Sequence, residues 1–127
     1  MIKGMEHVGL CAGDPKALAD WYVRILGFRI ARSLEEHNTF FIRAHDGGML
    51  EIYPAKHSTD PVDNVHRGLR HIAISAIDLD AEIDRLRAAG VTVPADTIVT
   101  TSDMKLAFFR DPEGNLLHLV ERAKDIL

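Results

Sequence analysis

Two stretches of the chain repeat each other and decide the fold: MEHVGLCAGDPKALADWY at residues 5–22 and LRHIAISAIDLDAEIDRL at residues 69–86. Aligned without gaps, at an offset of 64 residues, they pair His7 with His71. Each stretch alternates apolar residues as a strand does, and then changes to the spacing of an amphipathic helix after an aspartate. Aspartate at that point is typical of a helix N-cap. The match predicts two copies of one supersecondary unit.

A second alignment, at an offset of 67 residues, extends the repeat. It places FIRAHDGGMLEIY (41–53) over FFRDPEGNLLHLV (108–120) and so pairs Glu51 with His118. Each copy is predicted to contain a strand, a helix and three more strands, which gives an α+β protein of two tandem βαβββ modules. The predicted strands are 5–11, 28–35, 38–45 and 48–54 in the first copy and 70–76, 91–99, 104–110 and 115–121 in the second, with helices that begin after Asp14 and Asp78 and end at Gly27 and Gly90.

The repeat also predicts how the chain is organised. We expect one domain over residues 1–127, because this length leaves no room for a second globular unit. Between the copies, the segment AKHSTDPVDNVHRG is polar and has no periodicity, which indicates a linker. The predicted parts are module one at 1–54, the linker at 55–69, module two at 70–122 and a C-terminal tail at 123–127.

Composition excludes several classes of function. A formal net charge of −4 at pH 7 argues against binding to nucleic acid or to an anionic membrane surface. The longest apolar runs are a few residues, so neither a membrane span nor a signal peptide is expected, and we predict a cytoplasmic protein. The single cysteine, Cys11, cannot form an internal disulfide and is expected to pack in a strand as a small buried hydrophobic residue.

Four side chains that can bind metal occupy two pairs of equivalent positions in the repeat. His7 and His71 come early in the first strands, and Glu51 and His118 lie in the last strands. One inward histidine alone is more often a core residue, but the joint pattern favours a metal site. Imidazole nitrogens with one carboxylate suit Zn, Ni, Co, Fe or Mn, and such an ion offsets the cost of burying the carboxylate. The sequence therefore predicts one site at which the four residues converge.

The motifs MEHVGL, WYVRILGF, MLEIY, LRHIAI and FFRDPEGNLLHLVE cover nearly the whole chain and resemble the vicinal oxygen chelate superfamily. This group contains glyoxalase I, methylmalonyl-CoA epimerase, extradiol dioxygenases and antibiotic resistance proteins. The resemblance implies an eight-stranded cup around a divalent metal ion, a small-molecule substrate and a homodimer. It also implies that the metal ligands are His7, Glu51, His71 and His118.

His118 departs from the family pattern, because glyoxalase I-like members usually have glutamate there as ligand and base. Glu51 is then the remaining carboxylate for moving a substrate proton. Three neutral histidines and Glu51 leave a divalent site with a net charge of +1, which favours an oxygen-rich substrate. The leading hypothesis is a glyoxalase I-like lyase or isomerase that acts through an enediolate. An extradiol-type dioxygenase and a binding or resistance protein without catalysis are the alternatives.

Overall fold

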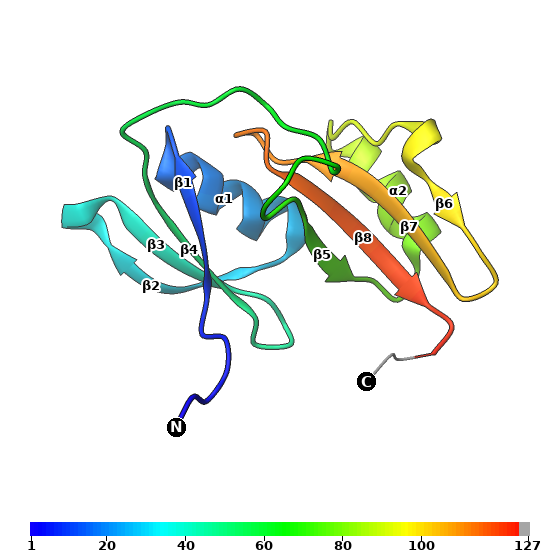
Figure 1. Cartoon of the computed structure of the whole chain (residues 1–127), viewed down its shortest axis with the longest axis horizontal. Coiled ribbons are helices and arrows are strands. Elements are labelled where there is room, and N and C mark those ends of the chain that lie inside the picture. The colour runs from blue at the N-terminus through cyan, green and yellow to red at the C-terminus, as the bar shows by residue number, and fades with distance from the viewer. Residues whose placement is uncertain (125–127) are drawn as a thin grey trace. The chain divides into compact units, whose positions relative to one another are not determined.

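The computed structural model describes residues 1–124, so the last three residues of the predicted tail lie outside the described part (Figure 1). The chain divides into two compact units, Met1–Asp60 and Pro61–Leu127. The first contains β1 (Val8–Ala12), α1 (Pro15–Leu26), β2 (Arg29–Leu34), the 3-10 turn η1 (Glu35–His37), β3 (Thr39–Arg43) and β4 (Met49–Pro54). The second contains β5 (Ile72–Ser75), α2 (Leu79–Ala88), the 3-10 turn η2 (Ala95–Thr97), β6 (Val99–Thr100), β7 (Met104–Arg110) and β8 (Leu116–Arg122).

The two units have the same topology, which confirms the tandem βαβββ prediction. Each holds a mixed four-stranded sheet, in the order β1-β4-β3-β2 in the first and β5-β8-β7-β6 in the second. The first strand of each unit pairs in parallel with the last, and the remaining neighbours are antiparallel. The helix that follows the first strand makes this parallel pairing possible, because a parallel pair needs a long crossover connection.

Both helices begin where their aspartates cap them. The side chain of Asp14 accepts a hydrogen bond from the Ala17 backbone N–H at 3.1 Å, and that of Asp78 accepts one from Ala81 at 3.2 Å. α1 ends at Gly27, whose φ of 74° lies in the left-handed region that glycine adopts without strain. These caps are the signals from which the sequence predicted the helix starts.

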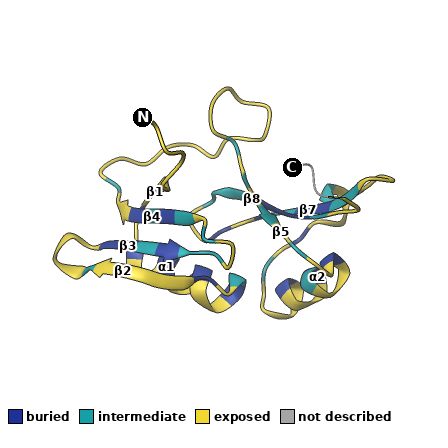
Figure 2. Cartoon of the chain, turned by 90° about the horizontal axis from the view of Figure 1, so that it is seen from below, coloured by how far each residue is buried: buried dark blue, intermediate teal, exposed yellow. Residues whose placement is uncertain are grey.

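One face of each sheet is buried against the helix of the same unit. In the first unit this face carries Leu10, Ile42 and Ile52, all of them buried. In the second it carries Leu117 and Leu119. In the first unit, buried positions alternate with more accessible ones along β3 and β4, because successive side chains of a strand point to opposite faces (Figure 2). Along β8 of the second unit, residues 117–120 are all buried. The face opposite the helix is therefore the more accessible one in the first sheet, whereas in the second sheet it includes the buried His118.

The turn before the last strand is built in the same way in both units. The Arg43 guanidinium donates to the Gly47 carbonyl at 2.8 Å, and Arg110 donates to the Gly114 carbonyl at 2.7 Å. Both glycines have a positive φ, 98° and 89°, which other residues rarely adopt. The 67-residue alignment pairs these arginines and these glycines, so the repeat extends to the hydrogen bonds of the turn.

The strand predicted over 91–99 is wrong for most of its length. Only Val99–Thr100 pairs with a neighbouring strand. Pro94 has no N–H to give to a sheet, and its carbonyl accepts a hydrogen bond from the Thr97 hydroxyl at 2.6 Å inside the turn Ala95–Thr97. Local bonds of this kind replace strand pairing. No helix within residues 1–124 has the length and apolar character needed to cross a membrane.

Candidate functional site

The predicted ligands occupy equivalent places in the two sheets. Gly9 pairs with Glu51 across β1 and β4, and Ala73 pairs with His118 across β5 and β8. His7 and His71 each come two residues before that glycine or alanine, immediately ahead of their strands rather than inside them. In each unit the entry histidine and the last-strand residue thus share the face opposite the helix.

A phenylalanine that the sequence analysis did not select completes each of these groups. Phe41 pairs with Glu51, and its ring meets the His7 ring edge to face with centroids 5.7 Å apart. Phe108 pairs with His118, and its ring meets the His71 ring in the same way at 5.9 Å. The 67-residue alignment also pairs the two phenylalanines, and this pairing could have indicated from the sequence that both belong to the site. An edge-to-face contact restricts how a histidine ring can turn.

In the second unit the two predicted ligands are in contact. The ring centroids of His71 and His118 lie 4.6 Å apart, with the ring planes tilted by 38°. His71 is exposed, whereas His118 is 8% exposed. Burial, followed by the electrostatic influence of His71 and Arg122, lowers the pKa of His118 from 6.5 to about 4. His118 is therefore neutral near pH 7, and a neutral imidazole has the lone pair that a metal ion needs.

Hydrogen bonds define which nitrogen each entry histidine leaves free. His7 Nδ1 lies 2.8 Å from a carboxylate oxygen of Glu6, and His71 Nδ1 lies 2.6 Å from the side-chain oxygen of Asn64. Because these oxygens only accept, Nδ1 carries the proton in both rings. In the neutral form of either ring, Nε2 then holds the lone pair, as in a histidine that binds metal.

Glu51 is half-buried in the middle of its sheet. Its carboxylate forms no hydrogen bond or ion pair with any other residue of the described range 1–124. A β-carbon on its neighbour Gly9 would come within 3.1 Å of the Tyr53 ring, so this ring already covers the glycine. Glu51 therefore has an aromatic neighbour on each side, Phe41 and Tyr53, and an open hydrogen-bonding capacity.

The donor chemistry of these residues fits a divalent transition metal ion. His118 Nδ1 is buried and has no hydrogen-bond partner among the described residues, and such an orphaned nitrogen is accounted for if a ligand or ion engages the ring. Each unit contributes one pair of predicted ligands, and within residues 1–124 no group of three or more His, Cys, Asp and Glu side chains is arranged to hold a metal. Convergence of all four side chains stays a prediction.

Cys11 lies on the same face of β1 as Gly9, and the expectation that it is buried is wrong. It is exposed, because the strand phase that buries Leu10 and Ala12 turns Cys11 to the opposite side. It pairs with Tyr53, next to the Gly9–Glu51 pair. The cysteine thus borders the predicted site instead of packing in the core.

Comparison with known families agrees with the two tandem βαβββ units. The family model described as the Glyoxalase/Bleomycin resistance protein/Dioxygenase superfamily matches residues 4–119. The chain belongs to this superfamily. Membership accounts for the paired βαβββ units and leaves the individual reaction open, because the superfamily name itself covers a glyoxalase, a bleomycin resistance protein and a dioxygenase.

Individual relatives match most of the chain. YwkD of Bacillus subtilis is 27% identical over 96% of this chain and 99% of its own length. A probable lactoylglutathione lyase of Vibrio parahaemolyticus is 26% identical over 91% of this chain and 88% of its own. The crystal structure of a glyoxalase family protein from Enterococcus faecalis superposes with a TM-score of 0.75 at 27% identity, covering 94% of this chain and 98% of that one.

Proposed function

We propose that this protein is a divalent-metal-dependent enzyme of the vicinal oxygen chelate type, a glyoxalase I-like lyase or isomerase. Its metal ligands are His7, Glu51, His71 and His118. The observation that carries the proposal is the equivalence of the two sheets. Each presents an entry histidine whose Nδ1 is hydrogen-bonded, and the residue two positions after this histidine pairs with Glu51 or His118 in the last strand. The match to the superfamily over residues 4–119 supports it.

The donor set defines the chemistry that a metal would supply. Three neutral imidazoles and one carboxylate suit Zn, Ni, Co, Fe or Mn. When bound, such an ion polarises a carbonyl oxygen of the substrate and stabilises negative charge that develops there. With one carboxylate among the ligands the site keeps a net charge of +1, so we propose a small substrate that chelates through two adjacent oxygens.

Glu51 is the proposed catalytic base. An isomerisation or lyase reaction through an enediolate requires a group that takes a proton from the carbon beside the substrate carbonyl and returns it to another position. His118 is unsuited to this role, because a neutral imidazole that binds metal through one nitrogen carries its proton on the other and has no lone pair left to accept one. Glu51 is the one carboxylate in the set, and within residues 1–124 no hydrogen bond or ion pair occupies it.

Proton exchange tests this proposal directly. We expect the protein, reconstituted with each candidate metal, to exchange the α-proton of small α-hydroxycarbonyl compounds with deuterated solvent, as followed by proton NMR. The Glu51→Gln variant keeps the shape of the side chain and should show no exchange above background. Absence of exchange with every metal and every compound of this class would overturn the proposal.

A ring-cleaving dioxygenase is the second candidate, because two histidines and one carboxylate also form the facial triad of non-haem iron oxygenases. Oxygen uptake with a catechol, after anaerobic loading with Fe(II), distinguishes it from the isomerase. A protein that binds a small molecule or antibiotic without catalysis would instead return its ligand unchanged and need no metal. The two assays and recovery of the ligand separate all three functions.

A further inference from the structure

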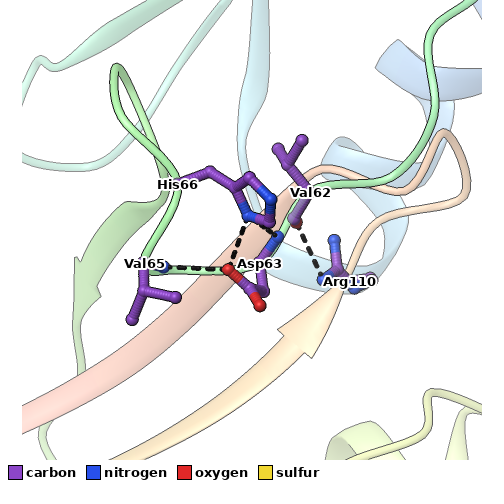
Figure 3. Close-up of polar contacts among 5 residues, drawn as sticks. All are labelled: Val62, Asp63, Val65, His66 and Arg110. Atoms are coloured by element: carbon purple, nitrogen blue, oxygen red, sulfur yellow. Dashed lines mark hydrogen bonds and ion pairs between the residues drawn. The ribbon is translucent and has the colours of Figure 1, made fainter.

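The segment 62–66, which precedes β5, is a folded loop rather than a plain linker. Asp63 organises it: its carboxylate accepts a hydrogen bond from the Val65 N–H at 3.1 Å and lies 2.7 Å from Nδ1 of His66, as Figure 3 shows. The bond from Val65, and then that to His66, lower the pKa of Asp63. A charged Asp63 therefore joins the Val65 backbone and the His66 side chain in one turn.

Arg110 fastens this loop to the second sheet. One arm of its guanidinium donates to the Gly114 carbonyl in the turn before β8, and the other donates to the Val62 carbonyl at 3.3 Å (Figure 3). The equivalent residue of the first unit, Arg43, makes the first of these bonds and directs its other arm to the Met49 sulfur. The attachment of the loop is thus a feature that only the second copy has.

The loop places one side chain against a predicted ligand. Asn64 lies between the two fastened residues, Asp63 and Val65, and its side-chain oxygen is 2.6 Å from Nδ1 of His71. In the first unit the residue just before the histidine, Glu6, provides the equivalent acceptor. The residue at that position in the second unit is Arg70, which has only donors and cannot take this role.

We propose that Asn64 is a positioning residue for His71. By accepting the Nδ1 proton it fixes the tautomer of the ring and leaves Nε2 with the lone pair, while Phe108 restricts the turn of the ring from its edge. The contribution to metal binding rests on the proposed function. The effect on the tautomer does not, because it involves only the histidine and the loop.

Two measurements on the full chain test this role. Nitrogen NMR of the metal-free protein above the histidine pKa should report the Nδ1–H form of His71 in the wild type and a shift toward Nε2–H in Asn64→Ala. Zinc titration against a competing chelator should show binding weakened by about 10- to 100-fold in the same variant. Asn64→Asp keeps an acceptor oxygen and should restore both readouts.

Ser58→Ala, an exposed change outside the loop, is the matched control and should leave both readouts unchanged. An unaltered His71 tautomer together with unaltered zinc affinity in Asn64→Ala would overturn the assignment. If Asn64→Ala shifts the His71 tautomer while the wild-type protein binds no metal, the result would overturn the proposed function and support the assignment of Asn64. Circular dichroism checks that each variant is folded.

Discussion

The two copies of the repeat reach the same geometry at the entry histidine by different routes. In the first unit His7 receives its acceptor from its sequence neighbour, Glu6, which is charged and exposed. In the second, His71 receives it from Asn64, seven residues earlier in a loop that Arg110 holds in place. The two copies therefore share the hydrogen bond at Nδ1 of the entry histidine, and they differ in the residue that accepts it.

The copies also differ at the last-strand position. Glu51 and His118 occupy the same place in the register, between a small residue on one side and a phenylalanine on the other. One contributes a negative charge, and the other a ring that burial keeps neutral. A duplicated scaffold thereby offers two positions of equal geometry and unequal proton chemistry, which suits a site that needs both a ligand and a base.

Among the predicted changes, removal of an entry histidine should have the largest effect, and it should act on metal binding. We expect His71→Ala to abolish retention of metal, measured by elemental analysis of protein purified without chelator. The loss should exceed the roughly 10- to 100-fold weakening typical of an outer hydrogen-bond partner, because a ligand itself is removed. His57→Ala, an exposed histidine between the modules, is the control. Equal metal content in both variants would contradict the predicted ligand set.

Acid should affect the second unit through His118. The folded state holds the pKa of this ring at about 4, whereas the unfolded chain binds the proton near the ordinary value of 6.5. Between these values the unfolded state carries more protons, so the free energy of unfolding of the metal-free protein falls as the pH is lowered from 6.5 toward 4. His118→Gln removes this contribution.

Urea denaturation measures the difference. The midpoint should fall between about pH 7 and about pH 4.5 by less in His118→Gln than in the wild type. Both proteins need a chelator present, so that metal binding does not add its own pH dependence. The same fall in both proteins would show that burial does not depress the histidine pKa.

The smallest expected effect concerns Gly9 and Ala73, which pair with Glu51 and His118 across their sheets. Ala73 stands where the first unit has Gly9, yet a β-carbon at Gly9 would lie 3.1 Å from the Tyr53 ring. Gly9→Ala should destabilise the protein by no more than about 1 kcal/mol, since the half-exposed ring can move aside. Adding Tyr53→Val, the residue type of the second copy at that position, should recover the loss. Thermal unfolding of both variants tests this, and an additive loss in the double variant would contradict it.

Much of the fold is predictable because the sequence contains two copies of the same βαβββ pattern. The aspartate caps, the glycine stops and the two offsets of 64 and 67 residues were sufficient to predict two βαβββ modules and the equivalence of the four ligand positions. The strand expected over 91–99 fails because an apolar alternation does not reveal that local bonds from Thr97 take the backbone acceptors.

The supporting residues of the site were harder to predict for a different reason. Phe41 and Phe108 each adjoin another apolar side chain, and a run of apolar residues does not show which of its members faces the core. Asn64 lies in a polar stretch without periodicity, and its role depends on a contact that only the folded loop creates. The exposure of Cys11 similarly depends on the strand phase, which the sequence left open.

The bond from Arg110 to the Val62 carbonyl also bears on where this chain can be divided. Residues from 61 onward belong to the second compact unit, so a fragment that begins there carries His71, His118 and the amide that orients His71. A fragment that begins at residue 70, where the second predicted module starts, would carry both histidines and lose the Asn64 amide. In fragment complementation or circular permutation, a junction after Asp60 therefore keeps Asn64 together with His71 and His118, and a junction at residue 70 does not.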